Sequence, residues 1–269
     1  MKAKQLKMPD DRRLQMPFLA LACLTAALWG SPGLAAGKHS YPVMAPIGEY
    51  LITSNTQEIA LARSAAPASI SEHAEVLVLG KQGYHIAVKG SNGFVCLVVR
   101  SWDNDFDKSE FWNPKMRAPY CDNAAAARSV LPRYLTRTQW VLAGESKTEI
   151  ENRETAELQA GKLKAPEPGS ICYMMSRQQY LNDQGKSWRP HVMFYLPRTQ
   201  DSSWGADLPG SPVLMGHQYV DRISVFMVLV PVWSDGTPAP ASSDLEIKAV
   251  SAFKKGLPQF SANYLFTRP

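Results

Sequence analysis

The sequence lacks the short motifs that identify several common enzyme classes. It contains no Gly-x-Ser-x-Gly elbow, Walker loop, dinucleotide-binding glycine fingerprint or His-Glu-x-x-His motif. Each of these motifs supplies one piece of chemistry: an exposed serine nucleophile, a phosphate cradle, a pyrophosphate site or a pair of zinc ligands. The sequence therefore gives no support to those four classes, and we expect no cofactor. It also has no internal repeat.

Cysteine is scarce, with four residues in a chain of 269. Cys96, Cys121 and Cys172 lie beyond residue 36, and none stands in a Cys-x-x-Cys metal or redox pattern. In an oxidising compartment two of these three are expected to pair. Cys96 with Cys121 is the local choice, worth roughly 3–4 kcal/mol by loop closure, while pairings with Cys172 stay open. The odd cysteine is then a buried small apolar residue, a reactive thiol or an intermolecular partner.

A concentrated positive charge is also missing from most of the chain. The formal net charge is +5, but five Lys or Arg and two Asp precede Gly37. The remainder carries 24 basic and 22 acidic residues without a basic cluster. We therefore expect no nucleic-acid partner.

The N-terminus lacks an apolar run long enough to cross a bilayer, which takes about 20 residues. A basic region is followed by the apolar residues 17–29 and by a small-residue exit at 34–37. This order is typical of a secretory signal peptide, here residues 1–36 with cleavage near Ala36. It predicts a periplasmic or secreted protein without a membrane span after cleavage. An uncleaved anchor is one alternative, and a lipoprotein acylated at Cys23 is another, although its apolar run, 17–22, is short.

The stretch 74–121 organises the predicted fold. It contains three runs rich in β-branched residues, 75–79, 84–89 and 94–99, with glycines at the corners between them. Such corners are hairpin signals, so we expect three antiparallel strands in a meander. Residues 171–175, 191–196 and 222–230 read as later strands.

Helix signals are fewer and local. Residues 56–65 follow possible caps at 54–56, and Asp122 can cap a helix over 124–131 that ends at Pro132. Ser146 with Glu149 forms a capping-box pattern before a polar surface helix over 147–160. Residues 134–143 stay undecided, and 102–120 read as an ordered aromatic loop that lies back on the sheet.

These signals predict an α+β fold: an antiparallel sheet, made of the meander and later strands, with a few short helices and long aromatic loops. The expected domain organisation is a signal peptide over 1–36, an extended lead-in over 37–54, one α+β domain over 55–237, and a C-terminal linker and tail over 238–269.

Several blocks of the sequence resemble a family of uncharacterised exported bacterial proteins. The blocks are residues 44–47 (MAPI), 58–67 (EIALARSAAP), 76–79 (VLVL), 90–94 (GSNGF), 111–115 (FWNPK), 172–176 (CYMMS) and 204–212 (WGADLPGSP). The resemblance spans most of the chain beyond the leader and implies export, but it brings no established activity. Members of the family often carry a second histidine just before the position of Pro190. Trp188 and Arg189 stand there in this sequence, which weakens a two-histidine metal site.

His191 is the most interesting titratable residue, because it opens an apolar strand beside Arg189. A histidine at a strand end can act as a general base or bind a metal. The competing interpretation is a half-buried histidine that bonds a neighbouring loop. Cys172 lies on a strand expected to pair with that of His191, so a Cys–His catalytic pair is conceivable.

Acidic residues gather in the aromatic loop as Asp103, Asp105, Asp107 and Glu110. Alternate carboxylates can converge on Ca²⁺. The run departs from the EF-hand pattern, which requires glycine at the sixth position and glutamate at the twelfth, so a solvated acidic loop is the competing interpretation.

Aromatic side chains in loops or at strand ends form the last group of candidates. They are Trp102, Phe111, Trp112, Trp188 and Trp204. Aromatic loops over a rigid sheet can bind a ligand or a partner, or they can cap the core of a loop-rich domain.

Two functions follow from these observations. The sequence favours a non-enzymatic envelope or secreted protein that binds a small molecule or an envelope protein through Trp102, Trp112, Trp188, Arg189 and Trp204. The alternative is an extracytoplasmic hydrolase-like enzyme in which His191 is the general base, with Asp103, Asp105 or Cys172 beside it.

Overall fold

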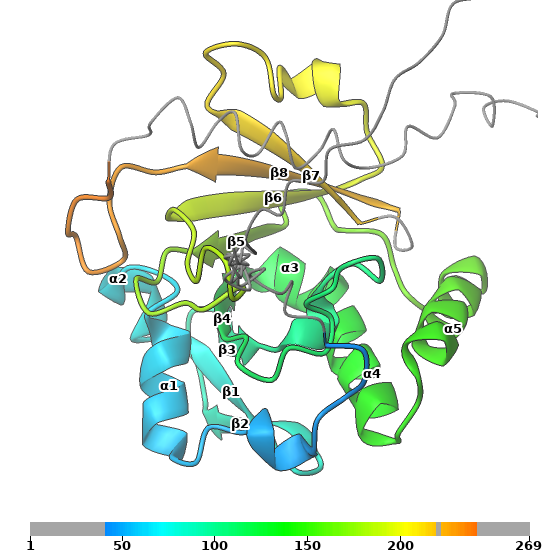
Figure 1. Ribbon diagram of the computed structural model, residues 1–269. Coiled ribbons are helices and arrows are strands. Elements are labelled where there is room, and N and C mark those ends of the chain that lie inside the picture. The colour runs from blue at the N-terminus through cyan, green and yellow to red at the C-terminus, as the bar shows by residue number, and fades with distance from the viewer. Residues whose placement is uncertain (1–40, 219–221, 241–269) are drawn as a thin grey trace, which may run out of the picture. The chain divides into compact units, whose positions relative to one another are not determined.

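The computed structural model describes residues 41–218 and 222–240. The predicted signal peptide, the start of the lead-in and residues 241–269 of the predicted tail lie outside these residues. Within them the chain forms a mixed, mostly antiparallel sheet of eight strands in the order β2-β1-β3-β4-β5-β6-β8-β7. This is an α+β fold, as the sequence predicts (Figure 1).

The strands are β1 Glu75–Gly80, β2 Gly83–Val88, β3 Val95–Val99, β4 Ala118–Asp122, β5 Ile171–Met174, β6 His191–Pro197, β7 Val213–Gln218 and β8 Ile223–Leu229. The helices are α1 Asn55–Arg63, α2 Ala68–Ser71, α3 Ala124–Ser129, α4 Leu131–Leu142 and α5 Lys147–Gln159. The described residues also form three short 3₁₀ helices, η1 Ile47–Glu49, η2 Ser101–Asp103 and η3 Asp201–Trp204.

The first three strands do not form the expected meander. β1 and β2 make the predicted antiparallel hairpin, but β3 pairs with β1, and in parallel. The connection after β2 crosses the start of β1, where Ser91 N donates to His73 O and Glu75 N donates to Phe94 O, both at 2.8 Å. Glycine corners predict turns but not which side of a hairpin the next strand takes, so the prediction was wrong on this point.

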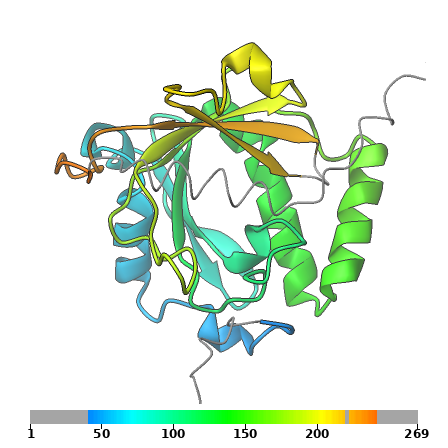
Figure 2. The ribbon, with the colours of Figure 1, turned by 45° about the horizontal axis from the view of Figure 1, so that its top comes forward.

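Helices cover both faces of the strands β1, β3 and β4 (Figure 2). α1 packs on the face that carries Val76, Val98 and the two paired cysteines. α3 and α4 pack on the other face, which carries Leu97, Cys172 and Tyr195. The sheet is therefore buried on both sides here, as the two-sided apolar pattern of β3 indicates.

The predicted helix starts are confirmed where the capping residue was correctly assigned. Ser54 accepts a hydrogen bond from Gln57 N at the start of α1, and the capping box of Ser146 and Glu149 opens α5. The cap of α3 is Asn123 rather than Asp122. Pro132 does not end a helix but stands in the first turn of α4, where its missing N–H leaves no hydrogen bond unmade.

The predicted disulfide is present, between Cys96 and Cys121. The two residues are direct cross-strand neighbours of β3 and β4, and both face α1. Cys172 is buried and not disulfide-bonded. It cannot exchange with the disulfide within this fold, because it lies on the α4 face of the sheet.

The lead-in packs into the domain. The Tyr50 side chain is fully buried, and its carbonyl accepts a hydrogen bond of 2.7 Å from Arg100 Nε. Arg100 also forms a buried ion pair of 2.8 Å with Glu58 on α1, and Glu58 accepts from Leu79 N of β1. These bonds join the lead-in, α1 and the sheet.

Candidate functional site

His191, the candidate general base, is 1% exposed at the start of β6. Its Nδ1 lies 2.7 Å from the carbonyl oxygen of Arg189, which can only accept, so Nδ1 carries the hydrogen. Burial lowers the pKa of His191 to about 4, although the Arg189 carbonyl raises it. The side chain is thus a neutral, backbone-bonded histidine, and the hydrolase hypothesis loses the observation on which it was based.

Cys172 does not form a pair with His191. Across the β5–β6 ladder Cys172 faces Met193, whereas His191 faces Met174. Burial, followed by the charge of Asp122, raises the pKa of the Cys172 thiol well above its ordinary value. A thiolate nucleophile is therefore disfavoured at this position.

The three aspartates of the aromatic loop do not converge. Asp103 is buried under α4, and burial raises its pKa to about 7. Asp105 is half-buried, with a pKa raised by burial to about 6. Asp107 is exposed beside Lys108. Among the described residues no three His, Cys, Asp or Glu side chains are placed to hold a metal ion.

Trp102 and Trp112 belong to the core. They are 2% and 5% exposed, within a cluster that includes Phe111 and α4. Trp102 Nε1 donates to Thr138 at 3.0 Å, and the carbonyl of Trp112 accepts from Tyr50 at 2.8 Å. Their positions fit the capping of a loop-rich core rather than ligand contact.

Trp188 and Arg189 are half-buried and held by the chain itself. The Trp188 ring meets His191 edge-on at 4.6 Å, and Gln179 donates to its carbonyl. Arg189 Nη2 donates to Pro240 O at 3.0 Å. These contacts tie the loop before β6 to the neighbouring segments.

Trp204 is the predicted aromatic residue that stays accessible. It ends η3, on the loop that runs from β6 to β7 at the top of Figure 1. Its ring lies nearly parallel to that of Phe226 on β8, with centroids 4.6 Å apart and an interplanar angle of 11°. Phe194 of β6 lies 5.9 Å away on the same face of the sheet. The residue nevertheless keeps 37% exposure.

The loop after Trp204 is built tightly. Gly205, Asp207 and Gly210 adopt φ values of 63°, 59° and 78°, in the left-handed region. Asp207 is not a glycine, and its backbone N donates to Val213 O while its carboxylate accepts from Met215 N. Left-handed residues other than glycine are enriched at ligand-binding loops. Leu208, 56% exposed, follows directly.

We call the exposed side chains of Trp204 and Leu208 the Trp204 surface; the half-buried Phe194 and the fully buried Phe226 pack against the Trp204 ring. It presents an aromatic ring that is fixed from below by Phe226, within reach of solvent and flanked by the exposed polar residues Ser202 and Ser203. Binding residues often lie on loops that a rigid scaffold positions, and the loop of Trp204 is held in this way above β6 and β8.

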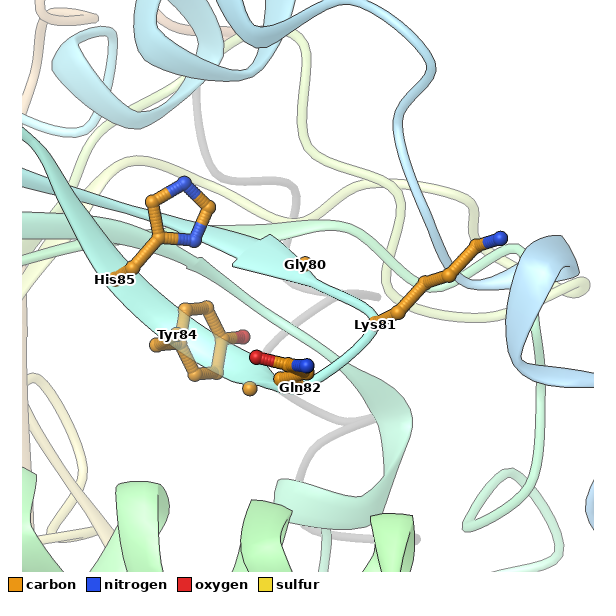
Figure 3. Close-up of a pocket in the computed structure, with 6 residues that line it drawn as sticks. Gly80, Lys81, Gln82, Tyr84 and His85 are labelled. Carbon is orange, nitrogen blue, oxygen red and sulfur yellow. The ribbon is translucent and has the colours of Figure 1, made fainter.

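A surface depression lies at the β1–β2 hairpin, but its polar side chains do not point toward one another. It is lined by Gly80, Lys81, Gln82, Gly83, Tyr84 and His85. Figure 3 shows Lys81 extending away from the strands, while Tyr84 and His85 point to opposite sides of β2. The Tyr84 hydroxyl donates a hydrogen bond of 2.7 Å to Val98 O.

A buried polar cluster under α4 escaped the sequence analysis. Its buried members are Asp103, Asp122, Arg133, Tyr134, Cys172 and Tyr195, and the half-buried Tyr120 lies beside them. Burial raises the pKa of Asp122 to about 7. Asp122 resembled a helix cap in the sequence, and only the alternation along β4, which places it on the same face as Tyr120, hinted at another role.

Comparison of the chain with protein-family models, with curated proteins and with solved structures finds no match in any of the three. The resemblance to exported bacterial proteins therefore stays a prediction. Among the described residues no helix is long and apolar enough to cross a membrane.

Proposed function

We propose that this protein is an exported, non-enzymatic binding protein that recognises sugar rings through the Trp204 surface. The observation that carries the proposal is the indole of Trp204, stacked flat on Phe226 yet 37% exposed. The apolar C–H face of a sugar ring packs on the face or edge of a fixed aromatic ring, while its hydroxyls bond polar neighbours. Ser202 and Ser203 precede Trp204 in η3 and are exposed, and the Ser203 hydroxyl donates to Gln200 O at 2.7 Å.

Export is supported by two features. The disulfide between Cys96 and Cys121 is typical of compartments that oxidise thiols. The N-terminal pattern of residues 1–36 has the order of a cleaved signal peptide. Together they favour a periplasmic or secreted location, where cell-envelope polysaccharides are the accessible sugar polymers.

The proposal is tested by co-sedimentation of the purified protein with insoluble peptidoglycan, chitin and cellulose. We expect at least one polymer to sediment the protein, and Trp204→Ala to abolish this binding. Trp204→Phe keeps a ring over Phe226 and should retain part of it.

Ile86→Ala is the matched control, because it removes an exposed apolar side chain from the edge strand β2. This variant should bind the polymer as the wild-type protein does. The proposal fails if no polymer sediments the wild-type protein, or if Trp204→Ala binds as well as the Ile86→Ala control.

A further inference from the structure

A row of directly paired residues crosses six strands of the sheet, from β3 to β7. Its members, in the order in which the strands lie, are Cys96, Cys121, Tyr173, Val192, Val228 and Val213. Side chains of directly opposed residues point to the same face of a sheet. The face that holds the disulfide beneath α1 therefore continues across β5, β6, β8 and β7.

The last three members of this row, Val192, Val228 and Val213, are half-buried, and we call them the valine row. Among the described residues, Val192 and Val228 belong neither to the core cluster beneath α1 nor to the cluster at Trp204. In Figure 1 the loop that carries η3 lies above β8, whereas α1 lies well below it. The valine row thus lies between two covered parts of one face.

An apolar strip on interior strands calls for a covering element, because the apolar face of a sheet is stable when another layer buries it. β6 and β8 are interior strands, and α1 supplies this layer for β1, β3 and β4. Its counterpart over the valine row must start from a segment that can reach the ends of β6 and β8.

The described chain comes to its last residues beside the valine row. Ala239 N donates to Pro231 O at 2.8 Å, and Arg189 Nη2 donates to Pro240 O at 3.0 Å. Pro231 and Arg189 each stand three residues from a member of the valine row, which is about 10 Å along a strand. The residues that follow Pro240 therefore begin within reach of this row.

The sequence after Pro240 has the pattern of an amphipathic helix. Leu245, Ala249, Ala252 and Phe253 stand at the spacing that places side chains on one face of a helix.

The ends of this pattern are also marked. Ser243 and Glu246 have the capping-box spacing, and Gly256 stands where a helix can end. Lys248 and Lys255 fall on the side opposite the apolar residues. A helix over 244–255 would be about 18 Å long, enough to cross β6, β8 and β7, which lie about 4.8 Å apart.

We propose that residues 244–255 dock on the valine row as an amphipathic helix, with Leu245, Ala249 and Phe253 toward the sheet. The apolar side of the segment and the valine side chains are then removed from water together. Lys248 and Lys255 stay in solvent. The C-terminal segment of the chain thus continues the layer that α1 begins, and the Trp204 surface is a separate site.

Thiol labelling of the protein with its complete C-terminal segment tests the docking. Val228→Cys places a thiol on the valine row, and Ile86→Cys places a reference thiol on the exposed edge strand β2. Replacing Leu245 and Phe253 together by Asp puts charge on the docking side of the helix. We expect this change to speed the labelling of Val228→Cys at least about tenfold and to leave Ile86→Cys unchanged. Cys172 is buried and supplies a constant background.

Replacing Lys248 and Lys255 together by Asp is the matched control, since it alters charge on the solvent side only, and labelling of Val228→Cys should stay slow. Ala249→Pro should speed labelling as the Leu245 and Phe253 replacement does, because proline breaks a helix. If Val228→Cys does not fold, Val192→Cys places the thiol on the neighbouring strand of the same row.

Three results would overturn the docking. The first is an unchanged rate when Leu245 and Phe253 are replaced, and the second is an equal acceleration by the Lys248 and Lys255 replacement. The third is a protection that is lost when the protein is diluted, which would assign the valine row to a second copy of the chain.

Discussion

At the scale of single residues, burial decides what each candidate group can do. His191 is chemically suited to acid–base work, but its ring is 1% exposed and its Nδ1 is hydrogen-bonded to the Arg189 carbonyl. Trp102 and Trp112 are likewise buried in the core, whereas the Trp204 side chain stays partly exposed to solvent. Residue type alone does not separate these cases, because each depends on what the fold places around the side chain.

The buried histidine predicts a specific pH dependence of stability. Its pKa is about 4 in the folded protein and about 6.5 when unfolded. As pH falls from about 6.5 to about 4, the unfolded chain takes up a proton that the folded chain resists, so stability is lost, by on the order of 3 kcal/mol. Above that window this contribution is fully present.

Urea unfolding of the wild-type protein and of His191→Asn across this range measures the effect. Asparagine can still donate toward the Arg189 carbonyl but does not titrate, so the acid-dependent difference between the two proteins isolates the histidine. If the His191 imidazole itself titrates near 6.5 by NMR in the folded protein, the prediction is contradicted.

At the scale of elements, the close crossing of the β2–β3 connection over β1 determines the order of the first strands. Gly90 lies at this crossing, where an added Cβ would stand 2.2 Å from Glu75 N and 2.8 Å from the Ala74 carbonyl carbon. Backbone atoms cannot move aside as a flexible side chain can. The crossing therefore requires a residue without a side chain.

Gly90→Ala should destabilise the protein by about 1–3 kcal/mol through this steric conflict. Chemical denaturation gives the difference in unfolding free energy. Gly48→Ala is the control, since no heavy atom lies within 4 Å of its added Cβ, and we expect a change within about 0.5 kcal/mol. Equal effects of the two substitutions would show that the crossing is not tight.

At the scale of the whole molecule, the disulfide and the two core layers hold together a chain rich in loops. Cys96 and Cys121 close a loop over a sequence separation of 25 residues and join the neighbouring strands β3 and β4 beneath α1. The other face of the same strands is covered by α3 and α4. The disulfide is therefore buried between the sheet and α1.

Replacing both paired cysteines by alanine should lower the unfolding free energy by roughly 3–4 kcal/mol, mainly because the unfolded chain gains freedom. Adding a reductant to the wild-type protein should give a loss of similar size. The same reductant should leave the double variant unchanged, and an effect there would assign the loss to something other than this disulfide.

The sequence by itself determined the features that depend on near neighbours. Ser54 and the Ser146–Glu149 box mark helix starts, because a cap bonds backbone groups only three residues away. Alternating and continuous apolar runs identify six of the strands, and the local cysteine pair is correct. β4 and β7 were missed because prolines and glycines obscure their short patterns within longer loops.

Only the tertiary structure decided which candidates are buried, which strands adjoin and which charges meet. The parallel pairing of β3 with β1 comes from a crossing connection, and turn residues do not specify its direction. The meeting of Asp122, Cys172 and Tyr195 requires β4, β5 and β6 to align side by side. Contacts between residues so far apart in the chain depend on the packing of the whole domain, and a single sequence records only the local part of that packing.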